Sequence, residues 1–171
     1  AIRRHPDRRI ELDHLPLTEW RRLAAVAPSA RDTLLLADRS GRANATAYLE
    51  RIQAIAPTGV AVGGVAAARH LTPDIDLTGL PRLDLSVHAP KDTAALGFLR
   101  TLDPALGPAA PDEPVIVALH FVRHLEPLFE ATARGVPWAD PVEVLLDLQE
   151  AGLLTQAAEL LEALTARVSR P

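Results

Sequence analysis

The turn before residues 141–151 fixes where a helix must begin. Pro141 suits the first turn of a helix, where its missing N–H would have no partner, and Asp140 can accept the free backbone donors. Apolar residues then recur at the spacing of one helical face. Gly152 suits the end of this helix, and a second leucine-rich helix is predicted over 155–168. We therefore expect an antiparallel helical pair that closes one side of the domain.

The two faces of this pair differ in polarity. The residues expected to face the core are Val142, Leu145, Leu146, Leu153, Leu154, Leu160, Leu161 and Leu164. The residues expected to face solvent are Glu143, Glu150, Glu159, Glu162 and Arg167. An apolar helical stripe usually packs on the core of its own chain, although an interface with a partner would use the same pattern.

Through the rest of the chain, predicted helices are separated by short runs that are either apolar throughout or alternate between apolar and polar residues. Strands are predicted over 8–12, 60–62, 83–87, 115–119 and 125–131. Helices are predicted over 18–26, 43–56, 65–71 and 93–102, and a loop over 103–114. Residues 27–41 fit a strand or a helix. This order predicts an α/β (α+β) fold, in which a small mixed sheet is flanked by helices.

The composition limits the class of protein. The 171 residues correspond to about one domain. The absence of Cys excludes a disulfide framework and a thiolate metal site, and it fits a cytoplasmic location. No apolar run reaches the ~18–20 residues that span a bilayer, so no membrane partner is expected. Because the chain contains no Met, even at its first position, we expect the natural N-terminus to lie upstream.

Arginines crowd the first 22 residues, although the net charge of −4 gives no overall attraction to nucleic acid. We divide the chain into a basic N-terminal segment, residues 1–42, and an α/β domain, residues 43–171. The N-terminal segment is expected to be a linker or the end of a winged-helix domain. A solvated basic surface is the favoured interpretation of these arginines, and a nucleic-acid contact is the alternative. The side chains that would make such a contact are Arg3, Arg4, Arg8 and Arg9.

A glycine pair and three aspartates suggest one enzymatic alternative. Nucleotidyltransferases of the polymerase-beta type carry such a pair at a helix start, where backbone N–H groups approach a triphosphate. Carboxylates on a following strand hold divalent ions, here Mg²⁺. Pro73 and Gly79 enclose the first two aspartates, so a solvated loop is the favoured interpretation of that stretch. The residues of this alternative are Gly63 and Gly64 for phosphate, and Asp74, Asp76 and Asp84 for metal.

Two histidines have a spacing that metal sites use on helices. His120 and His124 are four residues apart, which places two imidazoles on one helical face. The run at 115–119 predicts a strand instead, so both are expected to be ordinary surface or strand-end histidines. Our main interpretation therefore contains no catalytic residue, no metal and no cofactor.

Three blocks in order carry a family resemblance. They are residues 48–71, 81–87 and 114–148, and the best of them includes Asp140-Pro141-Val142 and Leu146-Asp147-Leu148. The chain resembles the C-terminal domain of AbiEi-type antitoxins of type IV toxin–antitoxin systems over roughly residues 43–165. The Gly63-Gly64 pair departs from the Gly-x-Ala-Ala expected in that family and is closer to nucleotidyltransferases.

The resemblance implies a transcriptional regulator rather than an enzyme. Its α/β domain would counteract a nucleotidyltransferase toxin, without the need for a stable complex. A winged-helix N-terminal part would bind promoter DNA and repress the regulator's own promoter. The implied partners are therefore promoter DNA and the cognate toxin.

Overall fold

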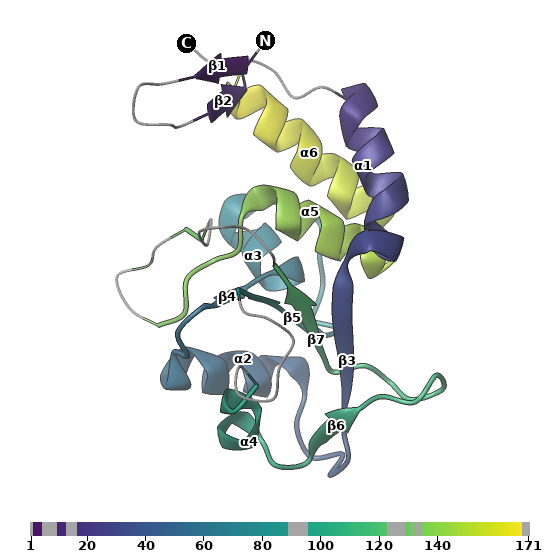
Figure 1. The fold of residues 1–171 in the computed structure, drawn as a ribbon, viewed down its shortest axis with the longest axis vertical. Coiled ribbons are helices and arrows are strands. Elements are labelled where there is room, and N and C mark those ends of the chain that lie inside the picture. The colour runs from purple at the N-terminus through teal and green to yellow at the C-terminus, as the bar shows by residue number, and fades with distance from the viewer. Residues whose placement is uncertain are drawn as a thin grey trace.

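A five-stranded mixed sheet forms the centre of the fold, with the strand order β4-β5-β7-β3-β6 (Figure 1). The computed structural model describes residues 2–4, 10–12, 17–88, 96–122, 129–130, 132 and 135–168. The strands of this sheet are β3 (Asp32–Asp38), β4 (Val60–Val62), β5 (Leu83–Val87), β6 (Leu106–Pro108) and β7 (Val117–Phe121). Strands β5 and β7 are parallel, and the other neighbours are antiparallel.

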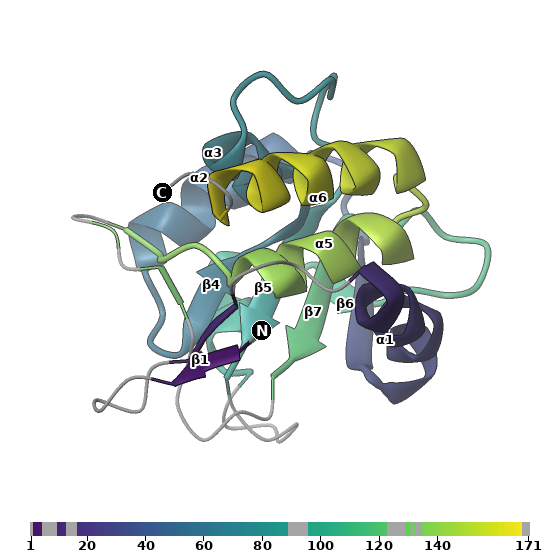
Figure 2. The same ribbon diagram turned by 90° about the horizontal axis from the view of Figure 1, so that it is seen from above.

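Helices cover both faces of this sheet (Figures 1 and 2). Helices α2 (Ala45–Ile55) and α4 (Phe98–Leu102) lie on one face, and α3 (Gly64–Leu71) and α5 (Pro141–Glu150) lie on the other. Helix α6 (Leu154–Val168) packs over α5, and α1 (Leu17–Ala30) lies beside them. The predicted α/β fold with flanking helices is confirmed.

Successive side chains of each strand point to opposite faces of the sheet, so the core is divided into two parts. Odd-numbered residues of β5 and β7, such as Leu85 and Leu119, pack against Tyr48 and Ile52 of α2. The even-numbered residues face α3 and α5, where Ala61 of β4 also lies. The polar side chains of the even-numbered positions are therefore enclosed between the sheet and α5.

Local capping explains where two of the helices begin. Asn44 Oδ1 accepts a hydrogen bond from Ala47 N at 2.9 Å, and Asp140 Oδ1 accepts one from Val142 N at 2.8 Å. Pro141 occupies the first turn of α5 as predicted, and Gly152 beyond its end has a φ of +76°. These signals are local in sequence, which is why the predicted bounds of α2, α3 and α5 agree with the structure to within two residues.

The two C-terminal helices fold back on each other as predicted (Figure 2). Some of their side chains, however, are not buried or exposed as expected. Leu145, Leu146 and Leu160 are buried. Val142 and Leu154 were expected in the core and are 38% and 64% exposed. Glu143 and Glu150 were expected in solvent and instead face Arg31, because that cation draws both carboxylates to one side of α5.

Other elements differ from the sequence expectation in extent. The ambiguous stretch 27–41 contains the end of α1 and then β3, and the predicted loop 103–114 contains β6. Strand β3 lies inside the sheet, between β7 and β6, and the division of the chain at residue 42 stays a prediction. Most of the strand predicted over 125–131 lies outside the described residues.

A second, two-stranded antiparallel sheet comprises β1 (Ile2–Arg4) and β2 (Ile10–Leu12) and precedes α1. The assignment of this segment to a winged helix stays a prediction. Arg3 and Arg4 belong to β1, whereas Arg8 and Arg9 lie outside the described residues. Among the helices that the structure describes, none has the length and apolarity needed to cross a membrane.

Candidate functional site

Three buried polar side chains meet between the sheet and α5. They are Asp84 of β5, His120 of β7 and Asp147 of α5, and their exposed fractions are 2%, 1% and 0%. One ligand atom from each lies within 4.8 Å of the others. We call these three residues the carboxylate–imidazole centre. Asp84 and His120 meet because they occupy even-numbered positions on adjacent parallel strands.

The two nitrogens of the His120 ring face different partners. Nε2 lies 3.1 Å from Asp84 Oδ1 and 3.4 Å from Asp147 Oδ1. Nδ1 lies 3.2 Å from Thr33 Oγ1 and 3.6 Å from Glu150 Oε2. The ring orientation is therefore set from both sides.

Arg31 covers the centre from the start of β3. Its Nη2 donates to Asp147 Oδ1 at 2.6 Å and to Glu143 Oε2 at 3.1 Å, and its Nη1 donates to Glu150 Oε2 at 3.3 Å. Burial by itself would lower the pKa of Arg31, but Asp147 and then Glu143 and Glu150 raise this pKa above its ordinary value. The guanidinium therefore stays charged in the interior.

Burial and neighbouring charges also have opposite effects on the pKa of His120. Burial lowers the pKa of the imidazole, but the charge of Asp147 and the hydrogen bond with Asp84 raise it, and Arg31 opposes them. The balance raises the pKa of His120.

The glycine turn before α3 closes around the same carboxylates. Gly64 N donates to Asp147 Oδ2 at 2.9 Å. A Cβ atom at Gly63 would collide with that oxygen, and one at Gly64 would collide with Asp84 Oδ2. Gly64 also has a φ of +53°, which side chains rarely tolerate. The glycine pair is therefore required by the packing of two aspartates against the turn.

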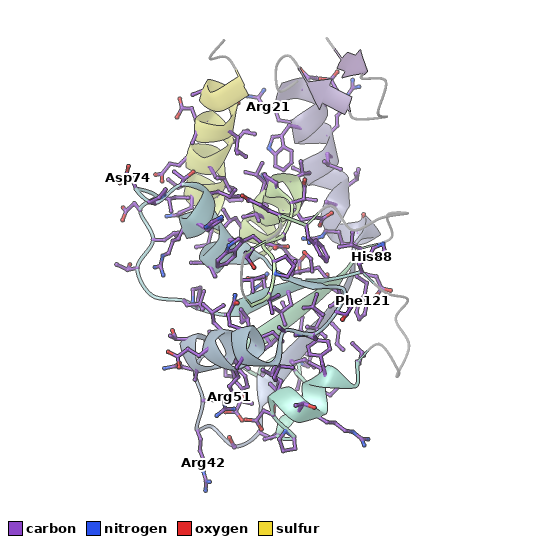
Figure 3. The ribbon with its side chains drawn as sticks, turned by 90° about the vertical axis from the view of Figure 1, so that its left-hand side faces the viewer. Arg21, Arg42, Arg51, Asp74, His88 and Phe121 are labelled. Atoms are coloured by element: carbon purple, nitrogen blue, oxygen red, sulfur yellow. The ribbon has the colours of Figure 1, made fainter. Side chains whose placement is uncertain are left out.

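The structure brings together only part of the predicted enzymatic set. Asp84 lies in the centre beside Gly63 and Gly64, and Arg82 Nε donates to its Oδ1 at 2.9 Å. Asp74 and Asp76 are exposed on the loop between α3 and β5. Figure 3 shows Asp74 pointing away from the sheet.

The prediction of no metal and no cofactor is wrong, because the buried Asp84–His120–Asp147 group has the donor atoms and the proximity to hold a metal ion. His120 was expected at a surface or a strand end, and it is buried because β7 is a central strand. His124 lies outside the described residues. Asp147 was missed as a site residue, although a lone carboxylate within the apolar run Leu145-Leu146-Asp147-Leu148 was a usable signal.

Neither a protein-family model nor a curated protein matches the chain. Among solved structures, the chain is similar to the crystal structure of the Megavirus polyadenylate synthase, with 16% sequence identity and a TM-score of 0.42. The match covers 90% of this chain and 34% of that chain, so this chain spans about a third of its length.

Proposed function

We propose that this domain transfers nucleotidyl groups with a divalent cation bound by Asp84, His120 and Asp147. The observation that carries the proposal is the meeting of two carboxylates with the Gly63–Gly64 turn at the start of α3. Backbone N–H groups at such a turn and a bound cation are two means by which proteins hold phosphates.

The charges around the centre favour a cation. Four carboxylates face two guanidinium groups in this network, which leaves a formal excess of two negative charges when His120 is neutral. One divalent ion matches that excess. When bound, such an ion polarises a phosphoryl oxygen and offsets the charge that develops during transfer. The charged members of the network are Arg31, Arg82, Asp84, Glu143, Asp147 and Glu150.

The surrounding residues hold the donors in place. Arg82 orients Asp84, while Arg31 and Gly64 N fix the two oxygens of Asp147. The three donor residues are at most 2% exposed, and we infer that Arg31 leaves Asp147 when a nucleotide binds. The released guanidinium would then be available to pair with a phosphate.

Transfer of label tests this proposal. The chain is incubated with labelled nucleoside triphosphates, Mg²⁺ or Mn²⁺, and a mixed RNA and tRNA acceptor. We expect labelled RNA with the wild type, background label with Asp84→Asn and unchanged label with the exposed control Asp74→Asn. Circular dichroism checks that each variant is folded. No transfer under any of these conditions, or transfer that survives Asp84→Asn, would contradict the proposal.

A second candidate is the antitoxin-like regulator of the AbiEi type. It is favoured by the closure of the centre: Gly64 N, which would otherwise be available to a phosphate, donates to Asp147 in this chain. In this alternative the centre stabilises a domain that acts on a toxin, and promoter DNA is bound by the N-terminal part. The discriminating observation is growth of cells that express the cognate toxin. Rescue by both wild type and Asp84→Asn, with no transfer in vitro, would favour the regulator.

A further inference from the structure

A buried hydroxyl without a partner lies beside the centre. Ser86 is 0% exposed, and its Oγ has no hydrogen-bond partner among the described residues. It is two residues from Asp84 on β5, so both point to the same face, and it is the register partner of His120 on β7. A buried hydroxyl without a partner is unfavourable, because the hydrogen bonds that it makes with water in the unfolded chain are not replaced. This cost indicates that a polar group, such as a water molecule, completes the site.

The spacing of the donors fits a small metal ion. Metal–nitrogen and metal–oxygen bonds to Zn²⁺ are about 2.0–2.2 Å, which puts neighbouring ligands of a tetrahedral site about 3.3–3.6 Å apart. His120 Nε2 lies 3.1 Å and 3.4 Å from the nearest oxygens of Asp84 and Asp147. All three can share one ion once Arg31 and Arg82, which donate to these same two oxygens, move aside.

The contacts of His120 on the side away from the aspartates also fit a metal-binding role. A histidine that binds metal through Nε2 carries its proton on Nδ1, and that N–H usually donates to a nearby oxygen. Nδ1 of His120 faces Thr33 Oγ1 and Glu150 Oε2.

We propose that Asp84, His120 and Asp147 bind one zinc-like divalent transition-metal ion, whose bound water is hydrogen-bonded to Ser86. An imidazole donor favours this class over Mg²⁺ and Ca²⁺, which prefer oxygen ligands only. The inference rests on the proposed function for the presence of a cation and deepens it by naming the class of ion. It differs from the Mg²⁺ of the sequence-based alternative.

Binding is measured without nucleotide, so that it is independent of activity. The chain is stripped with EDTA, titrated with Co²⁺ while its visible ligand-field absorption is followed, and then challenged with Zn²⁺ or Mg²⁺. We expect one Co²⁺ per chain, displacement by Zn²⁺, and an affinity for Mg²⁺ weaker than for Zn²⁺ by a factor on the order of 100. The ¹⁵Nε2 resonance of His120 should shift when Zn²⁺ binds.

Variants locate the ion. His120→Gln should abolish the Co²⁺ absorption, Ser86→Ala should weaken Zn²⁺ binding roughly tenfold through the lost water contact, and His70→Gln, at an exposed histidine, should change neither. If His120→Gln does not fold, the resonance of His120 in the wild type decides the outcome. Absence of stoichiometric binding, equal affinity for Mg²⁺, or an unshifted His120 resonance would overturn the inference. Metal binding without nucleotidyl transfer would leave the inference standing and reject only the proposed function.

Discussion

Single residues in the interior are constrained by identifiable partners, and Tyr48 gives the simplest test. It is the only tyrosine of the chain, it is fully buried, and its hydroxyl donates to Asp103 Oδ2 at 3.4 Å. Burial, and then the nearby charge of Asp103, raise the pKa of Tyr48 to about 12.

Ultraviolet titration of the phenol should therefore give a midpoint near pH 12 in the folded protein. The unfolded chain should titrate near the ordinary value of about 10. Because the folded-state pKa is raised, the contribution of Tyr48 to stability is complete below pH 10 and decreases as the pH rises toward 12. A midpoint near 10 before unfolding would contradict the buried position of Tyr48.

Asp147 is fully buried, and both of its carboxylate oxygens have hydrogen-bond donors. Its two oxygens accept from Arg31 and from Gly64 N. In Asp147→Asn, one oxygen becomes an NH₂ group that must face one of these donors, so we expect a loss of about 3 kcal/mol in the free energy of unfolding. Urea denaturation measures this loss. The matched change Asp74→Asn at an exposed carboxylate should have no measurable effect, and equal stability of both variants would refute the described contacts.

At the scale of elements, the glycine turn and the C-terminal pair determine how α3 and α5 pack on the sheet. The start of α5 at Pro141 and the strand–glycine–helix order of residues 60–71 were predictable, because capping, proline and glycine signals act within a few residues. The position of β3 was not, because the run Thr33-Leu34-Leu35-Leu36 satisfies both periodicities and only pairing with β7 decides between them.

Gly64→Ala should destabilise the fold for two reasons, and the control Gly79→Ala distinguishes between them. A side chain at φ +53° costs roughly 1–2 kcal/mol, and collision with Asp84 Oδ2 adds a further ~1–3 kcal/mol. Gly79 has a φ of +70° and no atom within 4 Å of an added Cβ. Gly79→Ala should therefore show the backbone cost alone in thermal unfolding. Similar losses for the two variants would show that the turn does not pack on Asp84.

The helical pair provides a matched comparison of burial. Leu146→Ala on α5 removes a side chain that is 7% exposed and should cost roughly 2–5 kcal/mol. Leu154→Ala on α6 changes a side chain that is 64% exposed and should stay within about 0.5 kcal/mol of the wild type. Denaturant midpoints measure both. If Leu146→Ala melts like the wild type but loses self-association or toxin rescue, the apolar stripe is an interface and not part of the core.

At the scale of the whole molecule, the centre joins parts of the chain that are distant in sequence. Arg31 and Asp147 are 116 residues apart, and Asp84 and His120 are 36 apart. No local pattern links such residues, which is why the sequence offered Asp84 only as the third carboxylate of a set with Asp74 and Asp76. The tertiary arrangement replaces those two with His120 of the next strand and Asp147 of a helix that covers the sheet.

Anomalous diffraction from crystals of the chain grown with Zn²⁺ tests the central claim most directly. Data collected on both sides of the zinc absorption edge locate the ion without reference to activity. We expect one peak between β5, β7 and α5, about 2.0–2.2 Å from His120 Nε2 and from one oxygen each of Asp84 and Asp147. Peaks confined to exposed histidines, with Arg31 still bonded to Asp147 and no density between the three residues, would contradict it.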